Sequence, residues 1–349
     1  MRLPCPVPAV APTLRKSQAD CVGFTTGHRQ NGARVKYRMK HMVEYGALRV
    51  LHGLMNLLPA RVARGLGIGL AWLAQGPMHS RVIEAHRRIR EVFGAAWSDS
   101  EVRRIAWISL RNTFLNGVEV LRMGRMDRAW VEQHIANLES MDPLRAHLQT
   151  GRGAILVVPH MGNWDLGGVA AHWLQLPVFM VVGHQKNPLT NAFMDSLRSG
   201  HDIETISRHD GPLRKVIRNL RAGKVLAFMT DTRAKSDGVA TQFLGKQAHV
   251  SGGMALFARQ ANVPIFPAVA IREGTDRHRW LVFDPIEPDP ALDKQTDTLR
   301  MTQAVIDIFD REIRRRPDQY FWYNRRWVLD PLPPPSAPPI PVPSPAVAA

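Results

Sequence analysis

A histidine and an aspartate five positions apart carry the clearest chemical signal in this sequence. His160 follows the apolar run 154–158, and Asp165 stands where a helix is expected to begin. On one regular helix, residues five apart point in different directions and do not meet. On a strand-to-helix turn they can meet, and the carboxylate can then orient the imidazole as a general base. We therefore predict that His160 and Asp165 form a catalytic pair.

The same spacing recurs in the chain, but in different surroundings. The other pairs are His79 with Glu84, His86 with Glu91 and His134 with Glu139. All three lie in helix-like stretches without a preceding strand, which is typical of solvated helix faces. Only His160 follows a buried-strand pattern and is followed by glycines, which allow close approach of the backbone. The surroundings therefore favour His160.

The composition indicates an anionic partner. The chain has 349 residues, of which 45% are hydrophobic and 22% charged, and its formal net charge is +16. Such a charge suits nucleic acid, an anionic lipid surface or an acidic carrier protein. Aromatic-plus-basic RNA signatures and zinc-finger spacings are absent from the sequence, so we expect no nucleic acid partner. Cys5 and Cys21 offer no metal framework, and no metal or cofactor is predicted.

The sequence divides into four regions. The expected regions are a disordered basic extension (1–40), a helical membrane-associating region (41–150), an α/β domain (151–330) and a Pro-rich disordered tail (331–349). The first tail could also reflect a wrongly assigned start, with Met39 or Met42 as the true one.

The region 41–78 predicts a helix that lies in a membrane surface. Its uncharged stretch, 65–78, is shorter than the roughly 20 residues that span a bilayer. Trp72 on one side, with Arg49, Arg61 and Arg64 at the edges, suits an interfacial helix. A helical hairpin packed on the next domain is an equal alternative, and the two do not exclude each other.

Beyond residue 153, apolar strand-like runs alternate with helical ones. The expected strands are 154–158, 178–182, 203–206, 225–229, 265–270 and 280–283, and the expected helices are 166–174, 188–198, 212–221, 253–260 and 294–315. This alternation predicts an α/β fold with a largely parallel sheet covered by helices. Catalytic groups of such folds gather at the carboxyl ends of strands, where His160 and Asp231 fall.

The order of several motifs is similar to that of a known family. After His160 and Asp165, with Asn163-Trp164 between them, the chain has Asn187-Pro188, Arg198 and Gly200, a strand ending in Asp231, Phe243-Leu244-Gly245 with Ser251, and the closing aromatic segment around Arg325 and Arg326. In this order the region from about 41 to 330 resembles the lysophospholipid acyltransferase superfamily. It resembles most closely the bacterial lipid A late acyltransferases, the lauroyl and myristoyl transferases. Thr232 and Asn324 depart from the family's frequent Gln and His, in regions expected to shape the acceptor pocket.

The resemblance implies an acyltransferase that needs no cofactor. The donor would be an acyl thioester of acyl carrier protein or coenzyme A, and the acceptor a hydroxyl of an anionic lipid. The protein would work at the cytoplasmic face of the inner membrane, in contact with the membrane surface. His160 would take the hydroxyl proton and Asp165 would orient it, while backbone N–H groups around Gly162 and Asn163 would meet the oxyanion.

The remaining site residues each have two interpretations. Arg198 is either the ligand of an anionic head group, which its planar fork suits, or a surface arginine. Asp231 either orients an arginine or the acceptor, or caps a helix. Arg325 and Arg326 either contact lipid phosphates or form a solvated basic edge.

Three other functions stay open on the sequence. The same catalytic pair would serve a lysophospholipid or aminolipid acyltransferase. It would also serve a thioester hydrolase, because water can replace the hydroxyl. The third is a non-catalytic membrane-binding protein, in which His160 and Asp165 make only a structural contact.

Overall fold

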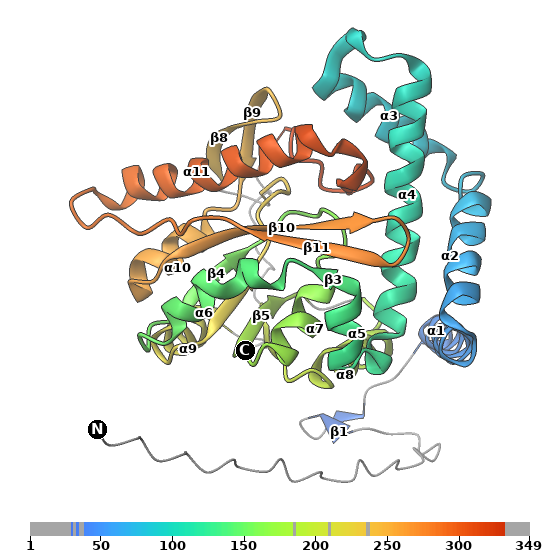
Figure 1. Cartoon of the computed structure of the whole chain (residues 1–349), viewed down its shortest axis with the longest axis horizontal. Coiled ribbons are helices and arrows are strands. Elements are labelled where there is room, and N and C mark those ends of the chain that lie inside the picture. The colour runs from blue at the N-terminus through green and yellow to red at the C-terminus, as the bar shows by residue number, and fades with distance from the viewer. Residues whose placement is uncertain are drawn as a thin grey trace, which may run out of the picture.

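The structure, a computed structural model, describes residues 29–30, 33–34, 38–183, 186–208, 211–234 and 238–331. The two tails predicted at 1–40 and 331–349 therefore lie largely outside the described residues. A short ladder pairs β1 (Arg29–Gln30) with β2 (Ala33–Arg34). The rest is built around one large sheet (Figure 1).

The central sheet has seven strands in the order β3-β11-β10-β4-β7-β5-β6. They are β3 (Ile135–Ala136), β4 (Ala154–Val157), β5 (Val178–Val182), β6 (Glu204–Ser207), β7 (Val225–Phe228), β10 (Ile265–Glu273) and β11 (Arg277–Val282). Only β10 and β11 pair antiparallel, and all the other neighbours are parallel. Every predicted strand overlaps an observed one, so the expectation of a largely parallel sheet is confirmed.

Helices cover both faces of the sheet, because its central strands are apolar on both sides. In β4, Ile155 and Val157 pack into one core and Leu156 into the other. The first core lies against α9 (Pro212–Arg221), α10 (Gly253–Ala261) and α11 (Lys294–Arg315), and the second against α5 (Arg128–His134), α6 (Asp142–Leu148) and α7 (Leu166–Trp173). Figure 1 shows α11 along one side of the β10–β11 ribbon and α5 to α7 along the other.

The hairpin of β8 (Val239–Phe243) and β9 (Lys246–Val250) was not predicted. Its two-residue turn is Leu244-Gly245, with φ of 53° and 83°. Positive φ at both positions is the geometry of a type I′ hairpin, for which Asn-Gly is the usual sequence signal. Leucine is uncommon at the first position, so this turn carries little of that signal. The buried side chain of Phe243 holds the hairpin on the core.

The first part of the chain is helical, as predicted. It forms α1 (Met39–Leu57), α2 (Ala60–Ala74), α3 (His79–Phe93) and α4 (Asp99–Leu121), with short 3₁₀ turns at Gly94–Ala96, Met123–Arg125, Leu138–Met141 and, near the end of the chain, Pro317–Gln319. A capping box formed by Ser98 and Glu101 starts α4. Among these helices and the others that the structure describes, none is long and apolar enough to cross a membrane.

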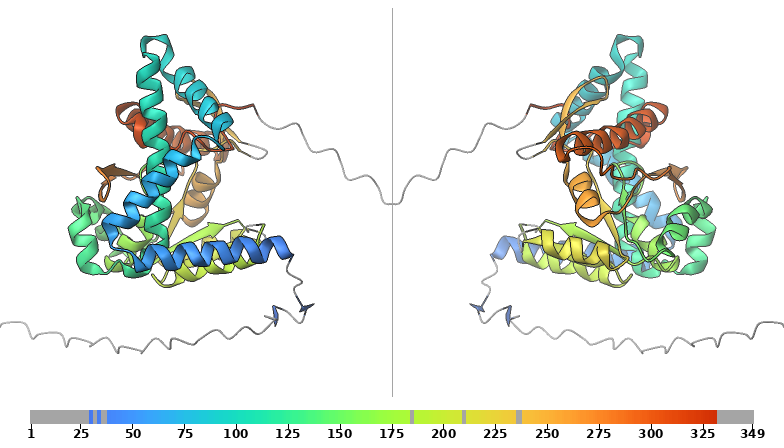
Figure 2. Two further views of the ribbon diagram at one scale, coloured as in Figure 1. Left: turned by 90° about the vertical axis from the view of Figure 1, so that its right-hand side faces the viewer. Right: turned by 90° about the vertical axis from the view of Figure 1, so that its left-hand side faces the viewer.

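The N-terminal helices pack against the α/β domain. A Cβ on Gly67 would lie 2.7 Å from Val118 Cγ2, so glycine allows α2 to approach α4 closely. The Asn187 side chain, at the start of α8 (Pro188–Ser199), donates to the His41 carbonyl at 3.0 Å and joins α8 to α1. Figure 2 shows α1 along the lower side of the molecule, with α2 rising from it. The helical hairpin packed on the domain is therefore present.

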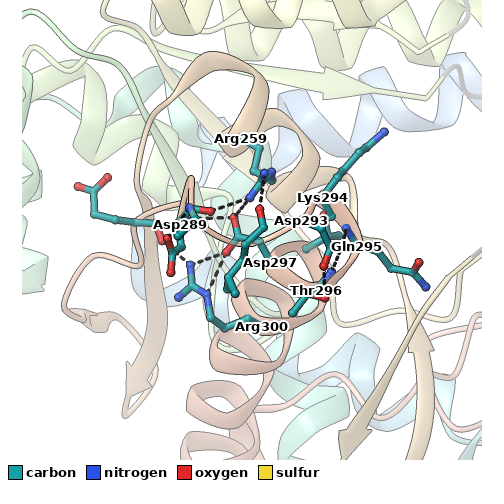
Figure 3. Close-up of polar contacts among 12 residues, drawn as sticks. Arg259, Asp289, Asp293, Lys294, Gln295, Thr296, Asp297 and Arg300 are labelled. Atoms are coloured by element: carbon teal, nitrogen blue, oxygen red, sulfur yellow. Dashed lines mark hydrogen bonds and ion pairs between the residues drawn. The ribbon is translucent and has the colours of Figure 1, made fainter.

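A buried carboxylate organises the start of α11 (Figure 3). The Asp297 side chain is fully buried and pairs with the guanidinium groups of Arg259 and Arg300. It also accepts a hydrogen bond from the Asp289 backbone N–H at 3.1 Å, and Asp293 caps the same helix end. Burial alone would raise the pKa of Asp297, but the hydrogen bonds from Arg259 and Arg300 outweigh it and lower that pKa.

We predict that Asp297→Asn lowers the free energy of unfolding by about 3 kcal/mol near pH 7, because it leaves two arginines without their anion. A carboxyl with a lowered native pKa stabilises the protein above its unfolded pKa of about 4, and this stability is lost as the pH falls through the native pKa. Urea unfolding between pH 3 and 7 should therefore show a shallower acid dependence in the variant.

The matched control is Asp142→Asn, which removes an exposed carboxylate 3.1 Å from Arg145. An exposed pair of this kind contributes less than about 1 kcal/mol. Equal destabilisation by the two substitutions would contradict the structural role of Asp297.

Candidate active site

His160 and Asp231 meet at the carboxyl edge of the sheet. His160 lies in the turn after β4, and Asp231 follows β7, which pairs with β4 in parallel. His160 Nδ1 lies 2.8 Å from Asp231 Oδ1, and the His160 backbone N–H donates to Oδ2, also at 2.8 Å. The Asp231 side chain is fully buried, whereas that of His160 is 21% exposed. One carboxylate therefore fixes both the backbone and the ring of the histidine.

The hydrogen bond that we predicted for Asp165 is made by Asp231 instead. Asp165 occupies the N-cap position of α7, and its backbone N–H donates to Asn163 Oδ1 at 3.2 Å. Asp231 follows a neighbouring strand, a relation that sequence spacing does not reveal. Asp165 is still close enough for its charge to act on His160. The structure thus brings His160, Asp165 and Asp231 together. Asp231 is hydrogen-bonded to the ring, whereas Asp165 acts on it through its charge.

The surroundings of His160 stabilise the positive form of its imidazole and so raise its pKa. Burial alone would lower its pKa, but the charge and hydrogen bond of Asp231, helped by the charge of Asp165, raise it above the ordinary value. Arg326 opposes them weakly. For Asp165, burial raises the pKa, and the positive charges of Arg198 and His160 offset part of that rise. A histidine whose positive form is stabilised is suited to accept a proton.

Gly162 fixes the turn after His160. Its φ is +60°, and a Cβ there would lie 2.3 Å from the Ala270 carbonyl oxygen. Only glycine allows this close approach to β10. The Gly162 N–H donates to the Gln319 carbonyl at 3.0 Å, so it is already engaged. This corrects the expectation that the Gly162 N–H would bind an oxyanion.

A buried polar network under the site joins α4 to the turn. Asn163 Nδ2 donates to Glu119 Oε2 at 2.6 Å, and Asn116 Nδ2 donates to the Gly162 carbonyl at 2.6 Å. Glu119 also binds the guanidinium of Arg272 on β10 and lies 3.1 Å from His278 Nε2 on β11. Burial alone would raise the pKa of Glu119, but Arg272 and His278 lower it to about 2. Asn163 is therefore an anchor of the turn in this structure.

The three predicted arginines have different surroundings. Arg198, in the last turn of α8, lies 3.2 Å from Asp195 and its charge acts on Asp165. The guanidinium of Arg326 donates to the Arg233 carbonyl and lies close enough to affect the pKa of His160. Arg325 is exposed. Arg198 is thus close enough to act on Asp165, and Arg326 is close enough to act on His160.

Aromatic rings border the imidazole. The Trp164 ring lies 5.0 Å from that of His160 and edge-on to it, and the Phe321 ring lies 6.5 Å away. The Phe321 backbone N–H donates to the His160 carbonyl at 2.9 Å, which ties the closing aromatic segment to the site. Trp164 also packs on the second core, so it anchors the turn and borders the histidine. The partly exposed His160 imidazole thus has aromatic neighbours.

Two surface cavities of about 470 and 410 Å³ lie elsewhere. The first is lined by α9 and Gln260, and the second by the Met123–Arg125 turn, α7 and α8. Within the part of the chain that the structure describes, no group of three His, Cys, Asp or Glu side chains is arranged to hold a metal ion. His160 reaches the surface outside both cavities.

The residues that support the site were not predicted from the sequence. Asn112, Asn116 and Glu119 are polar positions three or four apart on the buried side of α4. Such a polar stripe on a buried helix face signals a hydrogen-bonded partner, because unpaired buried polar groups are costly. Arg272, at the end of an otherwise buried strand, is a similar signal. Neither signal identifies the partner, which comes from a distant part of the chain.

The structure is an α/β fold with a histidine and two acids at the carboxyl edge of its sheet. Comparison with known proteins gives the family. The model of the bacterial lipid A biosynthesis acyltransferases matches residues 34–328, and the chain belongs to this family. The resemblance noted from the motifs is thereby confirmed.

Among its relatives is the phosphatidylinositol mannoside acyltransferase of Mycolicibacterium smegmatis, 26% identical over 289 residues, which are 79% of this chain and 89% of the relative. The lipid A biosynthesis lauroyltransferase of Escherichia coli is 27% identical over 279 residues, 78% of this chain and 88% of the relative. The phosphatidylinositol mannoside acyltransferase of Mycobacterium tuberculosis H37Rv is 29% identical over 197 residues, 54% of this chain and 59% of the relative.

Proposed function

We propose that this acyltransferase moves a fatty acyl chain from a thioester donor to a hydroxyl of a glycolipid acceptor. The donor is acyl carrier protein or coenzyme A, and the acceptor is an anionic lipid of the lipid A or phosphatidylinositol mannoside kind, as in the names of the relatives. The observation that carries the proposal is the His160–Asp231 pair, with its partly exposed imidazole at the sheet edge.

His160 acts as the general base in this proposal. Because Nδ1 is bound to Asp231, Nε2 is the nitrogen that takes the proton from the acceptor hydroxyl. The hydroxyl oxygen attacks the thioester carbonyl, the carbon–sulfur bond breaks, and the proton passes from the imidazolium to the leaving thiolate. Asp231 holds the tautomer and stabilises the imidazolium, and Asp165 adds a second negative charge.

Arg198 and Arg326 supply positive charge near the pair, acting on Asp165 and on His160 respectively. Arg198 keeps its predicted role as a ligand of an anionic substrate group, and its effect on Asp165 adds a second role as a partner of that carboxylate. Arg326 and the exposed Arg325 are proposed to contact phosphate. A lysophospholipid or aminolipid acceptor would use the same base, and comparison of acceptors in one assay distinguishes them.

We predict that His160→Ala lowers kcat for acyl transfer by roughly 10²–10⁴-fold, because the base is lost while the fold is kept. Asp231→Asn should cost more than Asp165→Asn, since only Asp231 is hydrogen-bonded to the ring. The measurement is transfer of a labelled acyl chain from its thioester to a glycolipid, with unfolding temperatures as the check on folding.

His79→Ala is the matched control, because His79 is exposed on α3. Transfer at near wild-type rate by His160→Ala would contradict the mechanism. Consumption of thioester by the wild-type protein without formation of an acylated lipid would identify a hydrolase. If the wild-type protein catalyses neither acyl transfer nor hydrolysis, it is a non-catalytic membrane-binding protein.

We further propose that α1 and α2 hold the protein on the cytoplasmic face of the inner membrane. Both helices expose large apolar side chains at helical spacing: Met39, Met42, Val43, Val50, Leu54 and Leu57 on α1, and Val62, Leu66, Leu70, Trp72 and Leu73 on α2. Of the predicted flanking arginines, Arg64 pairs with Asp276 at 3.0 Å and Arg49 lies 5.6 Å from the centre of the Phe193 ring. Arg61 is exposed. The apolar stripe therefore supports the proposal more than these charges do.

We predict that Leu57→Glu, Trp72→Glu and Leu73→Glu together weaken binding to anionic vesicles at least tenfold, because each exposed apolar side chain contributes on the order of 1 kcal/mol when buried in lipid. Vesicle co-sedimentation measures this. Leu213→Glu with Leu299→Glu is the control, since these leucines are exposed on α9 and α11. Complete release of the wild-type protein by high salt alone would contradict an apolar attachment.

A further inference from the structure

Three arginines from separate segments lie after strands or loops at the carboxyl edge of the sheet, the edge at which His160 also lies. Arg208 directly follows β6, Arg233 lies two residues after Asp231, and Arg326 belongs to the closing aromatic segment. Their charges interact: burial lowers the pKa of Arg326, and the nearby Arg208 and Arg233 lower it further. The charge of Arg326 in turn reaches His160. The cluster thus lies at the same sheet edge as the catalytic pair.

The backbone of this cluster is fixed. The Arg233 N–H donates to the Arg326 carbonyl at 3.2 Å, and the Arg326 guanidinium donates to the Arg233 carbonyl. The Arg208 N–H donates to the Val182 carbonyl at 2.9 Å. Arg233 and Arg326 are therefore held together as a unit, with the exposed Arg208 beside them.

The cluster lacks an anion among the residues that the structure describes. No carboxylate in the described ranges lies within 4.0 Å of the guanidinium nitrogens of Arg208, Arg233 or Arg326. The hydrogen bonds that Arg233 and Arg326 make with their guanidinium groups go to neutral carbonyl oxygens, and Arg233 Nε is buried without a partner there. By contrast, Arg259, Arg272 and Arg300 are all neutralised by carboxylates. Gathering like charges is unfavourable unless an anion joins them.

We propose that Arg208, Arg233 and Arg326 form a binding site for a phosphate ester of one of the two substrates. The inference rests on the proposed acyl transfer and adds the chemical group that the site recognises. Guanidinium groups suit phosphate because they offer paired N–H donors in a plane. Two sources have this chemistry: the phosphodiester of the donor's phosphopantetheine arm, and a phosphate on the acceptor lipid. Either would place the reacting group near His160.

Arg208→Gln is the main test, because Arg208 is exposed and its removal leaves the bonds between Arg233 and Arg326 in place. Two pairs of substrates differ only in phosphate: acyl-4′-phosphopantetheine and acyl-pantetheine as donors, and a phosphorylated glycolipid and its dephosphorylated form as acceptors. We expect KM for the phosphate-bearing member of one pair to rise roughly tenfold with little change in kcat. The phosphate-free member should be unaffected.

The pair that responds identifies the source of the phosphate. Arg208→Lys should show a smaller rise in KM than Arg208→Gln, because a point charge replaces the planar guanidinium only in part. Arg326→Lys should raise KM about as much as Arg208→Lys does, for the same reason. Arg104→Gln, on the exposed side of α4, is the control that removes one positive charge elsewhere. An equal rise in KM for phosphate-bearing and phosphate-free substrates, or no rise in any pair, would overturn the inference.

A binding measurement separates this inference from the proposed function. Calorimetry with 4′-phosphopantetheine, and separately with the phosphorylated glycolipid in detergent micelles, needs no turnover. Weaker binding of either probe to Arg208→Gln than to Arg104→Gln supports the site even if no acyl transfer is found. Unchanged binding of both probes contradicts it even if the wild-type protein is an active acyltransferase.

Discussion

The arrangement of the site depends on the Asp231 carboxylate. Its two oxygens accept hydrogen bonds from the backbone N–H and the ring of His160, so the histidine has one orientation and one free ring nitrogen. The contact exists because β4 and β7 are parallel neighbours whose carboxyl ends lie at the same edge. The order of strands in the sheet is therefore the constraint that brings Asp231 to His160.

A second constraint holds the turn from below. Glu119 on α4, with Arg272 and His278, forms a buried charged cluster that contacts Asn163. Such clusters contribute little net stability, because desolvation of the charges offsets their attraction. What they supply is a defined geometry, since an anion paired on several sides accepts few alternative arrangements. The long helix α4, which packs on α1 and α2, thereby links these helices to the turn that carries His160.

Much of the fold could be predicted from the sequence, because local patterns determine it. The apolar runs around Val157 and Leu226 and the cap at Ser98 identify strands and a helix start without tertiary information. His160 was found for the same reason, as the residue after a buried strand. Asp231 was not identified as the hydrogen-bond partner of His160, because it is 71 positions away in the sequence and only the strand order brings it to the histidine.

The supporting residues could not be located for a related reason. Asn116 and Glu119 are visible as polar positions in a buried helix, but the sequence does not reveal that they bind Gly162 and Asn163. The hairpin at Leu244 was missed because its turn departs from the usual residue types. Local sequence patterns thus do not determine which polar groups pair when they are far apart in the sequence.

The most direct test of the central claim is the titration of the His160 imidazole by nuclear magnetic resonance in three proteins. In the wild type its pKa should lie above the ordinary value of about 6.5, because the negative charges of Asp231 and Asp165 outweigh burial. Asp231→Asn should lower that pKa strongly, since burial then dominates, and Asp165→Asn should lower it less. A larger fall in Asp165→Asn than in Asp231→Asn would contradict the account.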